Sequence, residues 1–269
     1  MPIIDLYEYP SDAIAQLNYV SSNPPILNYP TLRTGIGTPT GTAIHNATEL
    51  QAMKDDLAGK YYLANDIDCT YCTQDPAGAL YNGGLGFEPV GNWDNKFTGI
   101  FNGNGHTITG LKINRSSTNY ISLFGYALSG EIKNIGMIDV DINGDDRVGG
   151  LIGTNHINSI VTNCYSTGAV SGGAYAGGLI EKNYGTVTNC YSTCAVVSGT
   201  NEAGGLIGYN TGGTYNDCFW DTETSGQATS AGGTGKTTAQ MKQEATFTNW
   251  NFTTIWAIVE DTSYPTINL

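Results

Sequence analysis

The most constraining feature of this sequence is a five-residue segment that recurs at nearly constant spacing. Gly-Gly-Leu-Ile-Gly at 149–153 returns as Gly-Gly-Leu-Ile-Glu at 177–181 and as Gly-Gly-Leu-Ile-Gly at 204–208, so the intervals are 28 and 27 residues. Degenerate copies around Leu123 and Ile100 precede these three. A fixed period in this range is typical of an array of stacked units, none of which can bury its own apolar face.

A second short pattern returns in register with the first. It reads Ile-Lys-Asn-Ile at 132–135, Val-Thr-Asn-Cys at 161–164 and 187–190, and Tyr-Asn-Asp-Cys at 215–218. A unit of about 27 residues with two such signals holds two or three short strands joined by turns, which is one coil of a parallel β-helix. We therefore predict an all-β solenoid of five to six coils, on the order of 25 Å tall at ~4.8 Å per coil.

The cysteines occupy informative positions in the repeat. Cys164, Cys190 and Cys218 form one column, and Ile135 takes the matching place in the preceding unit, so we expect the column to face inward. Free cysteine behaves as a small apolar core residue, which favours stacked buried thiols. Disulfides stay open as an alternative, because neighbouring parallel strands lie within bonding range. Cys69 and Cys72 form a single C-x-x-C, which is weak evidence for zinc and favours a local disulfide or two thiols.

Asparagine and glycine also recur in columns. Asn155, Asn183 and Asn210 follow the Leu-Ile strand, and Asn163 and Asn189 follow the second signal. We predict amide ladders between coils, and corners where Asn or Gly adopts a positive φ. The residues to which we assign a structural role in the repeat are Gly150, Leu151, Gly153, Gly178, Leu179, Gly205, Leu206, Gly208, Asn163, Asn189, Cys164, Cys190 and Cys218.

The chain divides into four predicted parts. Residues 1–43 hold six of the nine prolines and no repeat, so we predict an N-terminal arm, with a short helix at 13–19, that docks on other protein subunits. Residues 44–60 are predicted to form a helix that caps the stack. The β-helix occupies 61–221. A loop and an aromatic-rich C-terminal cap, with a short helix at 238–244, occupy 222–269.

Composition excludes several classes of function. The formal charge is −13, with 11 basic and 24 acidic residues, which argues against binding to nucleic acid or to anionic membranes. No segment approaches the roughly 20 apolar residues that span a bilayer. The N-terminus lacks the basic and apolar regions of a secretory signal, so we expect a chain assembled without export through that route. We predict no metal and no cofactor.

The repeats resemble those of proteins carrying the GLUG motif, named for its Gly-Leu-any-Gly core and found in bacterial and archaeal surface proteins. The core is present at 150–153 and 205–208, whereas the copy at 178–181 ends in Glu181. The resemblance covers about 45–269, including the tail from Cys218 to Trp256. It implies a right-handed parallel β-helix of the adhesin-like type and no catalytic residues. Residues 1–43 resemble leaders at the start of some phage structural proteins.

Two acids and two histidines are candidates for chemistry. Asp139 and Asp141 alternate with apolar residues, so both should project from one face of a strand, and an acid pair is what a glycosidase uses. No Arg, His or third acid recurs at this level in neighbouring coils, which argues against catalysis. His106 and His156 are isolated and are predicted to be hydrogen-bonded surface residues. The segment 230–237 imitates a phosphate-binding loop without its first glycine.

An aromatic column is the predicted binding site. Tyr165, Tyr191 and Phe219 lie beside the inward cysteines, so alternation aims them outward, and Trp220 is adjacent. An exposed aromatic ladder suits stacking against sugars. The alternative is that the N-terminal arm or a neighbouring subunit covers it.

These observations predict a non-enzymatic structural or binding protein on the exterior of a virion or a cell. We expect it to form a homo-oligomer or part of a larger assembly, and glycans are candidate ligands. Two alternatives remain open, a secreted adhesin with GLUG repeats and a tailspike-like enzyme that degrades polysaccharides.

Overall fold

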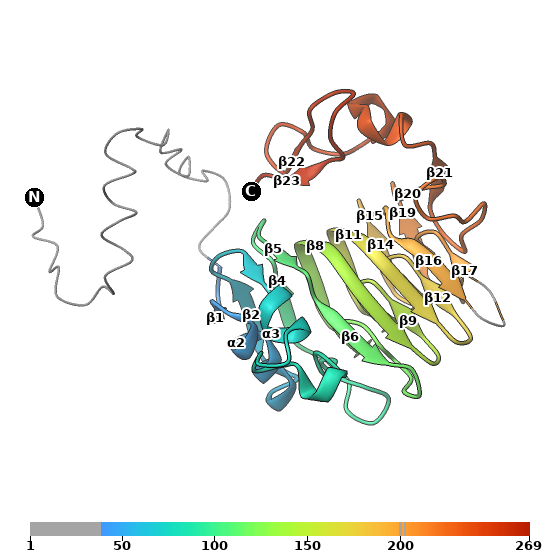
Figure 1. The fold of residues 1–269 in the computed structure, drawn as a ribbon. Coiled ribbons are helices and arrows are strands. Elements are labelled where there is room, and N and C mark those ends of the chain that lie inside the picture. Colours follow the sequence, from blue (N-terminus) through green and yellow to red (C-terminus); the bar gives the residue numbers. More distant parts are fainter. Residues whose placement is uncertain (1–38, 199–200, 202) are drawn as a thin grey trace, which may run out of the picture. The chain divides into compact units, whose positions relative to one another are not determined.

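Parallel pairing between successive coils defines the fold, which is a β-solenoid in a computed structural model (Figure 1). The structure describes residues 39–198, 201 and 203–269. Most of the predicted arm, with its helix at 13–19 and its docking surface, lies outside these residues, so its contact with other subunits stays a prediction.

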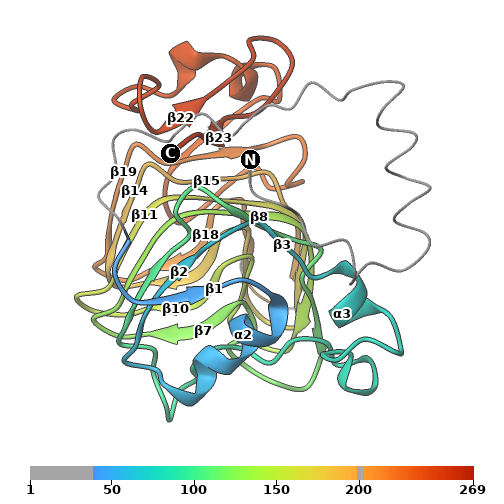
Figure 2. The same ribbon diagram turned by 90° about the vertical axis from the view of Figure 1, so that its left-hand side faces the viewer.

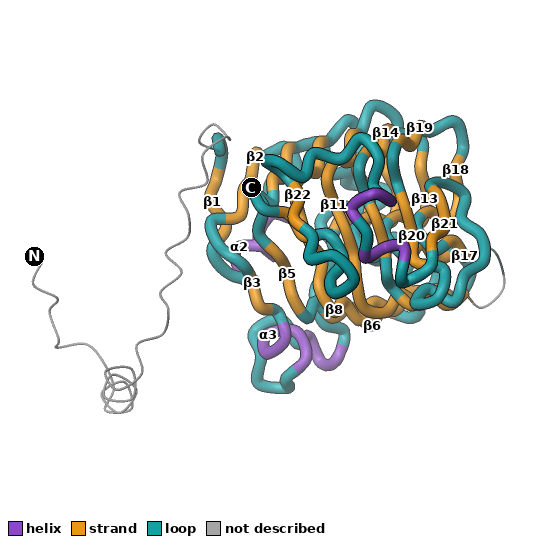
Figure 3. Tube along the Cα trace, turned by 90° about the horizontal axis from the view of Figure 1, so that it is seen from above, coloured by secondary structure: helices purple, strands orange, loops and turns teal. Residues whose placement is uncertain are grey.

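The largest sheet of the described residues has fourteen strands. Its main path runs through β1 (Thr42–Ile44), β2 (Lys60–Leu63), β4 (Ile100–Asn102), β8 (Glu131–Gly144), β11 (Ile160–Gly172), β15 (Tyr191–Ser192), β20 (Phe219–Asp221) and β21 (Thr234–Lys236). Strands that pair beside this path are β3 (Ile67–Asp68), β5 (Thr107–Thr109), β6 (Lys112–Arg115), β14 (Thr186–Thr188), β16 (Ala195–Ser198) and β19 (Thr214–Asn216). Figure 3 shows these strands lying side by side, with helices confined to short stretches.

Two smaller parallel sheets complete each coil. The second sheet contains β7 (Phe124–Ala127), β10 (Ile152–Asn155), β13 (Ile180–Asn183) and β18 (Ile207–Asn210), and the third contains β9 (Val148–Gly149), β12 (Ala176–Gly177) and β17 (Ala203–Gly204). The four strands of the second sheet mark about four regular turns. The predicted parallel β-solenoid is therefore confirmed, and its first sheet extends beyond these turns at both ends.

The helices of the described residues are short and lie outside the regular coils. They are α2 (Ala47–Ala52), α3 (Thr70–Gln74) and four 3₁₀ turns, η2 (Met53–Asp55), η3 (Asn82–Gly84), η4 (Gln240–Lys242) and η5 (Glu244–Thr246). The Asn46 side chain accepts a hydrogen bond from the Glu49 N–H at 2.9 Å and starts α2. Leu50 and Met53 enter the core. Because β1 pairs with β2, the stack begins at Thr42, before this helix and inside the predicted arm.

The cysteine column faces inward, as the repeat predicts. Cys164 pairs in register with Ile135, and both are fully buried. Cys164, Cys190 and Cys218 are free thiols, and each donates to a backbone carbonyl of its own coil at 3.2 Å. Burial raises the pKa of Cys190 and Cys218, so these thiols stay protonated. Cys69 and Cys72 are free as well.

Asparagine has two separate roles at the corners. Asn155 donates to Asn183 at 2.8 Å and Asn183 donates to Asn210 at 2.9 Å, which is the predicted amide ladder. In the other column, Asn163 and Asn189 both have a φ of 52°, the left-handed conformation that Asn tolerates. This second column also joins the coils, because Asn163 donates to the Asn134 oxygen at 3.0 Å and Asn134 donates to the Asn102 oxygen at 3.1 Å.

The glycines of the repeated core have a different role from the predicted one. Gly150, Gly178 and Gly205 do not adopt a positive φ. A Cβ built on Gly178 would lie 2.2 Å from the Gly205 carbonyl oxygen, and one on Gly150 would lie 2.2 Å from the Gly178 oxygen. Glycine is required because the backbones of adjacent coils approach closely at this corner.

We expect Asn183→Ala to lower the free energy of unfolding by about 2 to 3 kcal/mol. The change removes the bonds to Asn155 and Asn210 and leaves buried polar groups without partners, including the Gly185 N–H that bonds the Asn183 oxygen at 3.2 Å. Urea denaturation followed by circular dichroism measures the loss, with the exposed Asn119→Ala as control. Equal midpoints for the two variants would show that the ladder does not stabilise the stack.

Candidate functional site

The predicted aromatic column exists, but it is not exposed. Tyr165, Tyr191 and Phe219 align in register on neighbouring strands, and the rings of Tyr165 and Tyr191 stack with centroids 5.0 Å apart. All three are buried under the C-terminal segment, by which we mean residues 237–269. The cover consists of Met241, Phe247, Trp250, Trp256, Ile267 and Leu269. The prediction of an exposed sugar-stacking ladder is therefore wrong.

The C-terminal segment covers a flank of the stack rather than its end, as Figure 1 shows. An antiparallel pair, β22 (Trp256–Ala257) and β23 (Thr266–Ile267), shapes it. The Tyr191 hydroxyl donates to the Pro265 oxygen at 2.6 Å, and the Trp250 indole N–H donates to the Asp217 oxygen at 2.8 Å. Apolar and polar contacts together make the segment part of the fold.

Trp220 and Asp221 are structural as well. Trp220 belongs to the solenoid core and donates its indole N–H to the Gln227 oxygen at 3.2 Å. Asp221 is fully buried and accepts hydrogen bonds from the Thr238 and Tyr264 hydroxyls, both at 2.7 Å. Burial, together with the bond to this carboxylate, raises the pKa of Tyr264 to about 12. Both residues hold the segment after β20 against the last coil.

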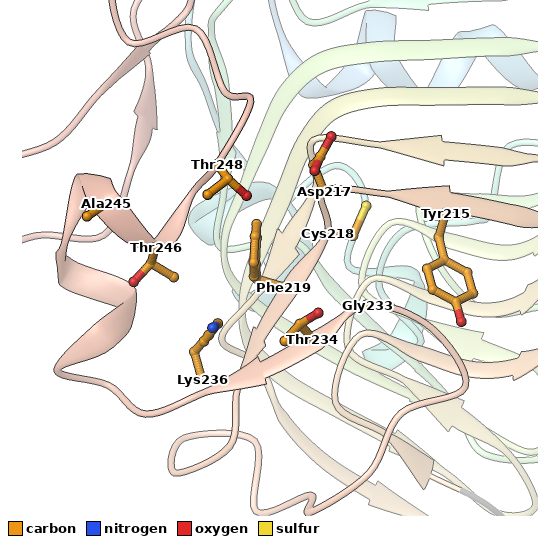
Figure 4. Close-up of a pocket in the computed structure, with 10 residues that line it drawn as sticks. All are labelled: Tyr215, Asp217, Cys218, Phe219, Gly233, Thr234, Lys236, Ala245, Thr246 and Thr248. Carbon is orange, nitrogen blue, oxygen red and sulfur yellow. The ribbon is translucent and has the colours of Figure 1, made fainter.

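A hollow lies between the last coil and the C-terminal segment (Figure 4). Tyr215, Phe219 and Lys236 line it from the coil, and Thr246 and Thr248 line it from the segment. Its one carboxylate, Asp217, accepts a hydrogen bond from Asn249 at 3.0 Å. Cys218 also lines it, but burial raises the pKa of this thiol, which stays protonated and donates to the Asn216 carbonyl oxygen at 3.2 Å.

Asp139 and Asp141 do not form the expected pair on one flat strand. Asp139 has a φ of 49°, and the register with β11 shifts between Ser166 and Gly168. The chain turns a corner here, so the two acids do not share a flat strand, although Val140 between them is buried as the alternation predicts. Both acids are exposed, and Asp141 forms an ion pair with Lys112 at 2.9 Å.

The structure reveals an aromatic cluster that the sequence analysis missed. It follows the outer side of the second sheet and consists of Trp93, Tyr120, Tyr126, His156, Tyr184 and Tyr209, which we call the aromatic band. Ring centroids lie 5.6 Å apart for Trp93 and Tyr126, 5.4 Å for Tyr126 and His156, and 4.9 Å for His156 and Tyr184. Figure 2 shows β7 and β10 on the side of the stack away from the C-terminal segment. The band thus lies on a flank that this segment leaves open.

Basic side chains accompany these rings. The Lys96 ammonium lies 5.4 Å from the centroid of Trp93, and the Lys182 ammonium lies 5.1 Å from the centroids of both Tyr184 and Tyr209. Among the described residues, neither lysine forms an ion pair with a carboxylate. Burial and the charges of both lysines lower the pKa of His156, so the imidazole lies in a positive field and stays neutral at pH 7.

Polar atoms beneath the band lack partners. The Thr154 hydroxyl, His156 Nδ1 and Glu181 Oε2 are buried without a hydrogen bond. Glu181 is only 1% exposed, and burial raises its pKa to about 8, although Arg147 at 3.9 Å opposes this shift. An unusual number of unsatisfied groups at one place is typical of a site that accepts a ligand or water.

A signal for the band is present in the repeat. The residue after the fourth core position is Tyr126, Thr154, Lys182 or Tyr209 in successive copies, and these four align in register. The residue after the ladder asparagine is His156 or Tyr184. Reading these two columns together would have predicted an aromatic and basic surface. Trp93 comes from an irregular loop and carries no such signal.

Two further features of the described residues bear on function. They contain no group of three or more His, Cys, Asp or Glu side chains placed to hold a metal ion. None of their helices is long and apolar enough to cross a membrane.

Comparison with known proteins gives one family motif and two relatives. The model of the GLUG motif matches residues 144–171. Halomucin of Haloquadratum walsbyi is 35% identical over 155 residues, which cover 55% of this chain and 2% of halomucin. A protein of Evansella cellulosilytica, named as a candidate Gly-rich membrane protein, is 26% identical over 82% of this chain and 44% of its own length. The chain therefore spans less than half the length of either relative.

One solved structure resembles the solenoid closely enough to compare. It is the crystal structure of a candidate immunoglobulin A1 protease from Bacteroides ovatus, with a TM-score of 0.56 over 86% of this chain and 95% of that chain. The identity is 17%, so the likeness shows the fold alone. The chain carries the GLUG motif at 144–171, which confirms the resemblance predicted from its repeats.

Proposed function

We propose that this protein is a non-enzymatic structural and binding protein of an extracellular assembly, displayed on a virion or on a cell surface. The observation that carries the proposal is the aromatic band. It presents exposed rings and cations without carboxylate partners from a rigid sheet, and the Thr154 hydroxyl beneath them forms no hydrogen bond with His156 that would activate it as a nucleophile. The motif match and the names of the relatives support an exterior setting over an internal one.

The observations bear differently on the two alternatives, the secreted adhesin and the polysaccharide-degrading enzyme. A secreted adhesin would use the same surface, and the likeness to long GLUG-type relatives supports it. A polysaccharide-degrading enzyme needs two carboxyl groups at a defined separation across a substrate. The corner at Asp139 and the ion pair of Asp141 do not provide that arrangement.

Two measurements test this proposal. Antibodies against residues 39–269 should label intact particles or cells of the producing organism without permeabilisation, because the solenoid lies outside. Incubation with a panel of polysaccharides should release no new reducing ends, for the wild type and for Asp139→Asn/Asp141→Asn alike. Labelling only after lysis would contradict the exterior location, and release that the double variant abolishes would establish the enzyme instead.

A further inference from the structure

His156 lies between two lysines, and this arrangement indicates that the aromatic band lacks an anionic partner. The ring centroid of Tyr126 lies 5.4 Å from that of His156 and 5.8 Å from the Lys96 ammonium. The ring centroid of Tyr184 lies 4.9 Å from that of His156 and 5.1 Å from the Lys182 ammonium. The described residues supply neither lysine with a carboxylate partner. The chain carries 24 acidic residues against 11 basic ones, so two ammonium groups left without an acid are unexpected. An anionic group from another molecule would complete this site.

The exposed rings indicate that the molecule carrying this anionic group is a sugar polymer. Trp93 is 57% exposed and Tyr209 is 40% exposed, and the half-buried rings of His156 and Tyr184 lie between them. From Tyr126 to Tyr209 the band crosses three coil steps, or roughly 14 Å at ~4.8 Å per step. One step is similar to the length of one pyranose residue, and the C–H face of a pyranose stacks on an aromatic ring.

The unpartnered polar groups provide the third element of the site. Thr154 is nine-tenths or more buried, and neither its hydroxyl nor His156 Nδ1 has a hydrogen-bond partner in the described structure. Both belong to β10 or to the residue that follows it, at the middle of the band. Hydroxyl groups of a sugar can satisfy a hydroxyl and an imidazole, whereas an apolar ligand would leave them unpaired.

From these observations we infer that the aromatic band binds a carboxylated polysaccharide, with one uronate carboxylate between Lys96 and Lys182 and neighbouring sugar rings against Trp93 and Tyr209. This inference rests on the proposed function and names the ligand class of its surface. A salt bridge to each ammonium and stacking along the sheet would act together. A neutral glycan would gain only the stacking.

Repulsion from the rest of the chain does not prevent this binding. The Debye length is about 8 Å at physiological ionic strength, so acids on the far side of the stack are largely screened. Within the band, the Asp146 carboxylate pairs with Arg147 at 3.6 Å, and Glu181 is buried. Asp94, next to Trp93 in the sequence, is exposed to solvent.

Affinity gel electrophoresis with polygalacturonate in the gel tests the inference, with dextran as the neutral polymer. We expect polygalacturonate, but not dextran, to retard the wild-type chain. Lys96→Gln/Lys182→Gln and Trp93→Ala should each weaken the association constant at least tenfold. The matched control is Lys60→Gln/Lys133→Gln, which removes the same charge from the first sheet and should bind as the wild type does. Circular dichroism establishes that each variant is folded.

Salt provides a second readout. Raising NaCl from about 0.1 to about 1 M shortens the Debye length from about 10 to about 3 Å and should abolish retardation. Equal retardation by dextran, no retardation by polygalacturonate, or equal losses in the control variant would each overturn the inference. Surface labelling of intact particles or cells is independent of this gel, so a failure here leaves the proposed display function standing.

Discussion

Tyr191→Ala is expected to lower the free energy of unfolding by about 3 to 5 kcal/mol, the usual range for deleting a large buried side chain. Tyr191 is only 1% exposed and lies at the centre of the interface between the solenoid and the C-terminal segment. The centroid of its ring lies 6.2 Å from the ring centroids of both Trp250 and Trp256, and the ring stacks on that of Tyr165. Truncation would leave a cavity that neither the rigid sheet nor the packed tryptophans can fill.

Two other variants separate the causes of this loss. Tyr191→Phe keeps the ring and removes only the hydroxyl that bonds the Pro265 oxygen, so we expect a loss of about 1 to 2 kcal/mol. Tyr215→Ala removes a tyrosine that is 41% exposed on an edge strand and should cost well under 1 kcal/mol. Urea denaturation monitored by circular dichroism and tryptophan fluorescence gives all three values. A Tyr191→Ala midpoint equal to that of Tyr215→Ala would mean that the segment is not an integral part of the fold.

The coil architecture was predictable because the spacing of the repeated residues equals the length of one coil. Leu151, Leu179 and Leu206 recur at the coil interval and all lie in the core. The cysteine column was predictable for a related reason, since Ile135 occupies the same position and an apolar residue there must face inward. Each of these predictions depends only on the neighbouring coil, whose sequence is nearly the same.

The errors arose where the role of a residue depends on a contact that the pattern along a single strand does not show. Alternation along the strand correctly placed Tyr165 on the outer side of the sheet, but the sequence pattern does not say that Trp256 would lie against it. The glycine at 178 was attributed to backbone conformation, whereas the contact that excludes a side chain comes from Gly205 in the next coil. Periodicity predicts which way a side chain points and not what covers it.

The aromatic band was missed because a search for repeated residues does not detect positions that vary between coils. The column that contains the band members Tyr126 and Tyr209 holds Thr154 and Lys182 in the two intervening coils, so the column does not appear as a repeat. A binding surface needs such variation, because each position along a ligand presents a different group. In a regular array such as this one, the variable positions that project outward are therefore where function is best sought.

Glu181 is expected to make the protein less stable as the pH rises from about 4.5 to about 8. It replaces the glycine found at this core position in the copies ending at Gly153 and Gly208, and burial raises its pKa from 4.5 to about 8. Between these two pH values the unfolded chain releases a proton that the folded chain retains, so unfolding becomes more favourable by ~1.4 kcal/mol per pH unit. Below about pH 4.5 both states are protonated, and the penalty disappears.

Glu181→Gln removes this titration while keeping the shape of the side chain, and Arg147 retains its ion pair with Asp146. The difference in unfolding free energy between the variant and the wild type should therefore increase by roughly 4 kcal/mol from pH 4.5 to pH 7.5, which is three pH units at ~1.4 kcal/mol each. Urea titrations at several pH values measure it, with the exposed Glu244→Gln as the matched control. A difference that stays constant across this range would show that the Glu181 carboxylate ionises in the folded state without penalty, and that Arg147 rather than burial determines its charge.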